Sequence, residues 1–203
     1  MDKNEAIEKL KTLVNQDLHE LAKTYDVSVL TPLGKVNKGW AGHVFERFLG
    51  LPLNSAQSPN FGSWELKSIP LKRCVSGNLT FKETMAVTMI DPYHVAHTPF
   101  AESHLLQKLR KAVVVTRIVG RTFAEPTFVH SVTEIELVGN LYNAVEADYE
   151  LARDCLNDPK RGFSCLTGKM GKYVQPRTKG KGHGSTTRAF YARPIFLRQF
   201  IVL

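Results

Sequence analysis

The stretch that decides the fold reads SPNFGSWELKSIPLK and covers residues 58–72. A region rich in turn-forming residues opens it, and a strand is predicted from about Trp64 to Leu71. Side chains alternate across a strand, so Glu65 and Lys67 lie on one face. A carboxylate and an ammonium on one face suit phosphodiester chemistry, because one holds a divalent cation while the other acts on the same substrate atom. The Leu66 carbonyl between them is a candidate further oxygen ligand. An isolated ExK pattern also occurs on solvated strand faces.

Outward from this strand, helical and strand-like patterns alternate along the chain. Apolar periodicity predicts helices over about residues 3–24, 37–49, 100–111 and 140–157, with a short one from residue 194. Apolar and β-branched runs predict strands over about residues 80–90, 112–119, 127–137, 172–175 and 188–192. We find neither an internal repeat nor a linker. The sequence therefore predicts one domain of mixed α/β (α+β) class over residues 1–203.

Basic residues are concentrated near the carboxy terminus. The first 158 residues hold 17 Lys or Arg and 19 Asp or Glu, whereas residues 159–203 hold ten basic residues and no acidic one. Such a block gains free energy by displacing the counterions condensed on nucleic acid. Aromatic and aliphatic residues interleave with these charges, which favours a folded DNA-reading segment over about residues 159–203. A solvated basic tail and a patch for acidic membranes are the alternatives.

Composition excludes other classes of protein. Hydrophobic residues make up 43% and charged residues 23% of the 203-residue chain, as in globular proteins. No uncharged apolar run approaches the roughly 18 residues that cross a bilayer, and the charged start MDKNEAIEK differs from a signal peptide. We therefore expect a cytoplasmic protein without a membrane partner. The three cysteines lack metal-site spacing and are expected to be reduced thiols.

The segment KGWAGHVFERFLG, residues 38–50, together with the ELK strand resembles the MutH family. This family comprises the nicking endonuclease of methyl-directed mismatch repair and restriction enzymes that cut at GATC. Its pattern is a KGWxGxxxExxLG helix, a loop with an aspartate and an ELKxIP strand, a form of the PD-(D/E)xK nuclease motif. Residues 103–109 and 148–150 and the TKG and RAFYAR segments resemble later blocks in the same order. The resemblance covers about residues 36–200 and implies a restriction-endonuclease-like fold, with a central mixed β-sheet flanked by helices.

The resemblance also implies roles for individual residues. It makes Glu65 a ligand of Mg²⁺, Lys67 the catalytic lysine, Glu46 a supporting acid on the preceding helix, and Lys108 a second lysine near the scissile phosphate. Without it, Glu46 is equally well interpreted as a charge on a solvated helix face, and Lys108 is interpreted as surface charge at the end of a helix, so the role of Lys108 depends on the resemblance alone. The DNA-binding residues that it implies are Lys38, Gly39, Arg177, Lys179, Lys181, Arg188 and Tyr191.

The chemistry of these side chains agrees with DNA reading. Arg177 and Arg188 carry the planar donor fork that suits guanine, whereas Lys179 and Lys181 suit phosphates or guanine. Tyr191 matches the family's tyrosine at the adenine of GATC. A tyrosine in a strand is otherwise more often a core residue, so this role depends on the resemblance.

One position departs from the family pattern. The metal-binding aspartate is expected directly before Phe61, where this chain has Asn60. An amide oxygen coordinates Mg²⁺ but brings no charge, so the candidate catalytic and metal site loses one negative charge. An engineered inactive variant, a naturally impaired homologue and a shifted alignment each explain it. We favour the first, because the rest of the motif is intact.

Together these features predict a Mg²⁺-dependent, sequence-specific endonuclease that acts on double-stranded DNA. The leading interpretation is a type II restriction enzyme that hydrolyses both strands at a short site, GATC, either as a homodimer or as a monomer acting on each strand in turn. The alternatives are a strand-nicking enzyme of mismatch repair and a catalytically inactive DNA-binding protein.

Overall fold

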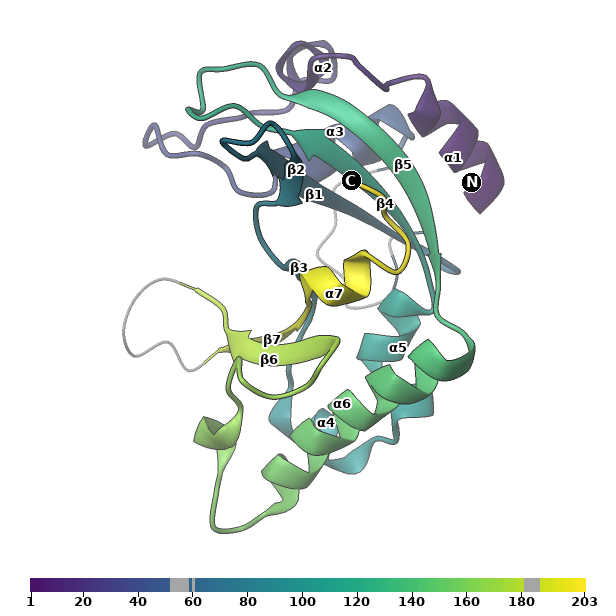
Figure 1. The fold of residues 1–203 in the computed structure, drawn as a ribbon, viewed down its shortest axis with the longest axis vertical. Coiled ribbons are helices and arrows are strands. Elements are labelled where there is room, and N and C mark those ends of the chain that lie inside the picture. Colours follow the sequence, from purple (N-terminus) through teal and green to yellow (C-terminus); the bar gives the residue numbers. More distant parts are fainter. Residues whose placement is uncertain (52–58, 60, 181–186) are drawn as a thin grey trace.

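Two β-sheets with helices packed against them form the molecule (Figure 1). The computed structural model describes residues 1–51, 59, 61–180 and 187–203. The larger sheet has the order β2-β1-β4-β5, formed by Leu79–Phe81, Glu65–Arg73, Lys111–Ile118 and Phe128–Glu136. The smaller sheet has the order β3-β7-β6, formed by Met85–Met89, Arg188–Ala192 and Val174–Thr178. The predicted mixed class, with a mixed central sheet flanked by helices, is confirmed.

The pairing of β1 with β4 organises the larger sheet. The two strands are parallel, in a register that runs from Glu65 beside Ala112 to Leu71 beside Ile118, whereas β2 and β5 join them antiparallel. Residues 112–115 of β4 have no solvent exposure. A strand that is covered on both faces in this way is typical of a parallel pair between helical layers.

Helices cover the two faces of this sheet with separate hydrophobic clusters. Helices α1 (Lys3–Lys11), α2 (Leu18–Thr24) and α3 (Trp40–Phe48) pack on the face that holds Leu66 and Val113. The opposite face, with Ile69 and Val114, packs in a second cluster. The helices that contribute to this cluster are α4 (Pro92–His97), η1 (Phe100–Glu102), α5 (His104–Leu109), α6 (Gly139–Asn157), η2 (Phe163–Cys165) and α7 (Pro194–Leu197). None of the helices in the described part of the chain has the length and hydropathy needed to cross a membrane.

The helix predicted over residues 3–24 is wrong in one respect, because it consists of two helices. The first helix ends at Lys11, and the turn that follows it closes at Asn15, whose φ of 69° lies in the left-handed region. Asp17 then begins α2 by accepting a hydrogen bond from the His19 amide at 3.0 Å. The same carboxylate oxygen accepts from the Thr127 amide at 3.2 Å, which ties the break to the loop before β5. A long-range contact of this kind leaves no trace in the helical periodicity.

Two other predicted elements are also divided. The strand predicted over residues 80–90 is β2 followed by β3, and these strands belong to different sheets. The helix predicted over residues 100–111 is η1 followed by α5, because the Ser103 hydroxyl caps a new helix by accepting from the Leu106 amide at 3.1 Å. Helix α4, which Asp91 caps, was not predicted. The strands β1, β4, β5 and β7 and the helices α3, α6 and α7 lie close to their predicted positions, and β6 lies further toward the carboxy terminus.

A buried carboxylate joins the two halves of the molecule. Asp148 of α6 accepts hydrogen bonds from the amides of Lys172, Tyr173 and Val174 at 2.7, 2.7 and 2.8 Å. Gly171 precedes this cluster with a φ of 71°, and a Cβ there would lie 1.9 Å from the Val174 carbonyl oxygen. Asp148 therefore fixes the start of β6 on the long helix, and only glycine fits beside it.

Replacing this carboxylate is expected to destabilise the fold strongly. Asp148→Ala leaves three amides without their partner, that of Val174 buried and those of Lys172 and Tyr173 part-buried. We expect the free energy of unfolding to fall by roughly 1–3 kcal/mol for the buried donor, with smaller losses for the other two. Urea denaturation monitored by circular dichroism measures the change. Asp154→Ala, which removes an exposed carboxylate from the same helix, is the control and is expected to change stability by less than about 0.5 kcal/mol. Equal effects of the two substitutions would contradict this role.

Candidate active site

Glu65 lies at the centre of the candidate site. The residue begins β1 and has no solvent exposure. Its Oε1 accepts hydrogen bonds from the ammonium groups of Lys67, on the same face of β1, and Lys108, in the last turn of α5, the latter at 3.3 Å. A buried charge is costly unless it is paired, and these two cations provide that pairing for the carboxylate. The predicted pair of Glu65 and Lys67 is thus joined by the predicted second lysine.

Glu46 of α3 is close enough for its titration to depend on this cluster. Burial raises the pKa of Glu46, and the negative charge of Glu65 raises it further, while Lys67 and Lys108 act in the opposite direction. Burial also lowers the pKa of Lys108, although Glu65 opposes that shift. The structure therefore brings together four predicted residues from α3, β1 and α5.

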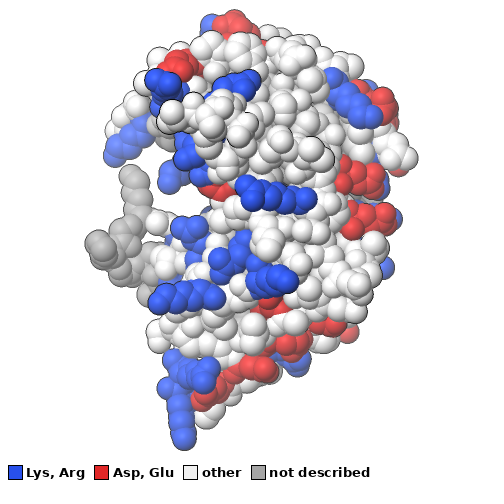
Figure 2. All heavy atoms as spheres, viewed as in Figure 1, with Lys and Arg blue, Asp and Glu red and all other residues white. Residues whose placement is uncertain are grey.

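A cleft of about 620 Å³ runs from this cluster between the two sheets. Its walls include the side of β1, the turn after β2, and the β6–β7 hairpin. The residues that line it are Lys38, Lys67, Ser68, Ile69, Pro70, Glu83, Thr84, Met85, Ala86, Arg177, Thr178, Lys179, Gly180 and Tyr191. Figure 2 shows Lys and Arg gathered around the hollow between the upper and lower parts of the molecule, with Asp and Glu mostly toward the opposite edge. The lining is therefore suited to a polyanion.

The β6–β7 hairpin contributes three of the predicted DNA-binding residues to the cleft. The Arg177 guanidinium lies 5.1 Å from the centroid of the Tyr191 ring and donates a hydrogen bond to the Thr84 hydroxyl at 3.3 Å. Burial lowers the pKa of Lys179, and the positive charge of Lys67 lowers it further. Lys179, which directly follows β6, therefore lies near the cluster around Glu65, although the two are far apart in sequence.

The start of α3 forms another part of the wall. Lys38 is exposed and lines the cleft, and Gly39 caps the helix. A Cβ on Gly39 would lie 3.1 Å from the His43 imidazole. Burial lowers the pKa of His43, and the nearby Arg47 charge lowers it further. Lys38 therefore lines the cleft, whereas Gly39 lies next to it at the start of the helix and is not among the lining residues.

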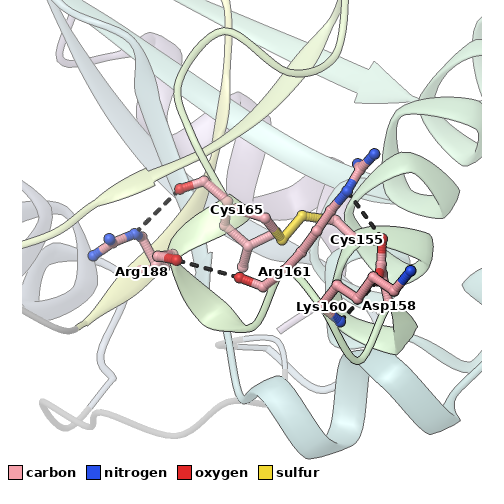
Figure 3. Close-up of a disulfide and its surroundings, with 8 residues drawn as sticks. Cys155, Asp158, Lys160, Arg161, Cys165 and Arg188 are labelled. Atoms are coloured by element: carbon pink, nitrogen blue, oxygen red, sulfur yellow. Dashed lines mark hydrogen bonds and ion pairs between the residues drawn. A yellow bond between two sulfur atoms is a disulfide. The ribbon is translucent and has the colours of Figure 1, made fainter.

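Arg188 has a different place from that expected. Its guanidinium donates to the Leu166 carbonyl at 3.3 Å and lies 5.4 Å from the centroid of the Phe163 ring, and the residue is not among those that line the cleft. Figure 3 shows it beside the disulfide of Cys155 and Cys165. The arginine thus contacts the 3-10 segment η2 at the base of the hairpin.

The expectation of three reduced thiols is wrong. Cys155 and Cys165 form a disulfide with a Cα–Cα distance of 6.2 Å, while Cys74 is free and exposed (Figure 3). The last turns of α6 and the η2 segment pack together, which brings the two cysteines within the range that a disulfide spans. A spacing of ten residues does not reveal this packing.

Two predicted residues, Asn60 and Lys181, lie outside the described residues. Conversely, sequence reasoning did not identify Glu83 and Thr84, which line the cleft. They belong to a segment that was read as continuous strand, so no signal for a turn that faces the site was recognised.

The donor chemistry of the described residues fits a hard divalent cation in part. Glu46 and Glu65 supply carboxylates, the ligand type that Mg²⁺ prefers, and burial together with the negative charge of Glu65 raises the pKa of Glu46. Within residues 1–51, 59, 61–180 and 187–203, no cluster of three or more His, Cys, Asp or Glu residues is placed to hold a metal. A further ligand therefore has to be a backbone or amide oxygen, such as that of Leu66, or a residue outside these ranges.

The raised pKa of Glu46 predicts a pH dependence of stability. The folded protein binds this proton more tightly than the unfolded chain does, so the stabilisation is complete below the ordinary pKa of 4.5 and is lost as pH rises through the raised pKa. In the parent protein the free energy of unfolding is expected to fall between about pH 4 and about pH 7 as Glu46 ionises. Glutamine does not ionise, so the fall is expected to be smaller in the Glu46→Gln variant. Urea denaturation in the presence of a chelator measures it. The exposed Glu102→Gln is the control, and an unchanged pH profile in both variants would contradict the inference.

Comparison with known proteins agrees with the motifs. The model of the MutH family, described as DNA mismatch repair enzyme MutH, matches residues 49–125, which include Glu65, Lys67 and Lys108. The type II restriction enzyme Sau3AI of Staphylococcus aureus is 25% identical over 190 residues, which are 89% of this chain and 38% of that enzyme. The chain thus spans well under half of the length of this relative.

A solved structure of the restriction endonuclease MvaI with its cognate DNA substrate matches with a TM-score of 0.37 and 11% identity, over 86% of this chain and 90% of that one. The family model and the curated relative agree with the resemblance seen in the motifs, and the chain is similar to MutH-like restriction endonucleases.

Proposed function

We propose that this chain is the catalytic part of a DNA endonuclease that hydrolyses phosphodiester bonds at a short duplex site. The observation that carries the proposal is the buried Glu65 carboxylate paired with Lys67 and Lys108, because Lys67 also lines a cleft with basic walls. Phosphodiester cleavage needs stabilisation of negative charge beside an oriented water, and this cluster has the groups for both. The similarity to the type II restriction enzyme Sau3AI favours type II restriction, and the motif resemblance favours the site GATC. We propose residues 1–203 as one domain.

The roles of the individual residues follow from their positions. Mg²⁺ held by Glu65, with the Leu66 carbonyl and residue 60, would supply Lewis-acid stabilisation of the phosphate. Lys67, beside Glu65, is placed to donate a hydrogen bond to the attacking water and to stabilise the charge that develops on the phosphate. Lys108 adds a second positive charge near the scissile phosphate. Glu46, whose pKa burial raises, is the supporting acid.

Recognition is assigned to the walls of the cleft. Arg177 stacks on Tyr191, which leaves its planar fork to reach a guanine edge, and Tyr191 is proposed to contact the adenine. Lys179 and Lys38 are proposed to bind phosphates on the two sides of the cleft. Arg188 and Lys181 belong to the same basic segment. Cutting both strands requires either a homodimer or one copy that acts on each strand in turn.

Two observations favour alternative functions. The matching family model is that of a mismatch repair enzyme, which favours a strand nickase, and Asn60 in place of the family's aspartate favours a protein that binds DNA without cutting it. Cleavage assays separate all three, because a nickase relaxes a supercoiled plasmid whereas a restriction enzyme makes it linear.

The first prediction from this proposal concerns Asn60. As given, the chain is expected to bind duplex DNA and to cut it slowly or not at all, because a neutral amide replaces a metal-binding carboxylate. Asn60→Asp is expected to cut a plasmid that contains GATC when Mg²⁺ is present, and to stop when a chelator is added. Sequencing the cleaved ends gives the site. The control is Asn143→Asp, which adds one negative charge at an exposed position of α6, and this variant should not gain cleavage activity. Full cleavage by the unchanged chain would contradict the role of residue 60.

The second prediction concerns Lys67. In the Asn60→Asp protein, Lys67→Ala is expected to lower the cleavage rate by roughly 100- to 1000-fold or more, because a donor to the reacting phosphate is lost. Binding to the same duplex is expected to persist, as the phosphate and base contacts remain. Single-turnover cleavage and fluorescence anisotropy measure the two effects. Lys111→Ala, which removes an exposed lysine at the start of β4, should change neither. A near-normal cleavage rate would remove Lys67 from the mechanism.

A further inference from the structure

Two further hollows continue the cleft away from Glu65. The first, of about 400 Å³, shares Lys38, Pro70 and Glu83 with the cleft. The second, of about 780 Å³, shares Lys82 and Arg121 with the first. Together they form what we call the flanking groove, whose basic residues are Lys38, Lys72, Arg73, Lys82, Arg117 and Arg121. The groove is therefore a continuous extension of the candidate active site.

The charge of the flanking groove is strongly positive. Its lining has two acidic residues, Glu83 and Glu125. The Glu125 carboxylate accepts hydrogen bonds from the amides of Arg121 and Thr122 in its own loop, both at 3.1 Å, and these hydrogen bonds lower its pKa. Among the described residues, none of the groove's six cations forms an ion pair within 4 Å. Such cations are available to an anionic ligand.

Arg117 is the most constrained of these cations. Its guanidinium lies 5.7 Å from the centroid of the Trp40 ring, which in turn stacks on His19 at 4.9 Å. Its Nε is buried and has no hydrogen-bond partner in the described part of the chain. Burial lowers the pKa of Arg117 to about 10, so it remains charged at neutral pH. A buried donor that is held in place and lacks an acceptor is expected to gain most from an anion in the hollow.

We propose that the flanking groove binds the phosphate backbone of duplex DNA outside the recognition site. This inference rests on the proposed function, because the groove opens from the proposed active-site cleft. Duplex DNA carries about one negative charge per 1.7 Å of helix axis, so a row of unpaired cations continuous with the cleft matches the flank of a bound duplex. Lys82, Arg117 and Arg121 make these contacts. The contacts are independent of sequence, in contrast to base reading by the β6–β7 hairpin.

The test compares two duplexes with the chain as given. Both contain GATC, and the longer one extends by about 10 base pairs, roughly one helical turn, on each side. The double variant with Lys82→Ala and Arg121→Ala removes two phosphate contacts. Its affinity for the longer duplex at about 0.1 M salt is expected to fall about eightfold for each lost contact, and the slope of log K against log salt is expected to become shallower by about 1.8. Its affinity for the shorter duplex is expected to equal that of the parent. Fluorescence anisotropy over a salt series measures both quantities.

The control is the double variant with Lys9→Ala and Lys11→Ala, which removes two exposed lysines of α1 that line none of these hollows. It should behave as the parent does on both duplexes. If the Lys82 and Arg121 variant keeps the parent's affinity and salt slope on the longer duplex, the flanking groove is not a DNA surface, although the proposed function stands. If the parent binds neither duplex, the proposed function itself fails.

Discussion

The carboxylate of Glu65 has no solvent exposure, and the rest of the site depends on how its charge is balanced. A buried carboxylate costs several kcal/mol unless cations and hydrogen bonds compensate it. Lys67 comes from the same strand, but Lys108 comes from α5, so the compensation requires the helical layer to pack on the larger sheet. Two of the predicted catalytic groups therefore meet only because the sheet and the helices fold together.

The charged groups around Glu65 are also subject to unfavourable desolvation and to repulsion between like charges. Burial raises the pKa of Glu46 and lowers those of Lys108 and Lys179, and like charges add to the shifts of Glu46 and Lys179. Sites of this kind are commonly less stable than the rest of a fold, because their groups are placed for chemistry. Stability is supplied elsewhere, by two hydrophobic clusters on opposite faces of the sheet and by the three amide hydrogen bonds of Asp148.

The division into two sheets gives the proposed nuclease its shape. The strand that carries Glu65 and Lys67 lies in the larger sheet, and the hairpin with Arg177 and Tyr191 lies in the smaller one (Figure 1). One side of the cleft therefore holds the proposed catalytic lysine Lys67, and the other side holds the proposed DNA-reading residues. The disulfide and the contacts of Arg188 hold the base of the hairpin against α6. The flanking groove continues the basic surface beyond the cleft, along the ends of β1 and β4.

The sequence by itself determined the strand with Glu65 and Lys67, the long helix α6, the mixed class, and the family to which the ordered motifs point. These features depend on neighbours within a few residues, or on a motif that stays contiguous in the chain. Only the tertiary structure decided the break at Asn15, the pairing of Cys155 with Cys165, the orientation of Arg188 and the groove around Arg117. Each of these depends on packing between elements that are far apart in sequence, for which periodicity and spacing carry no signal.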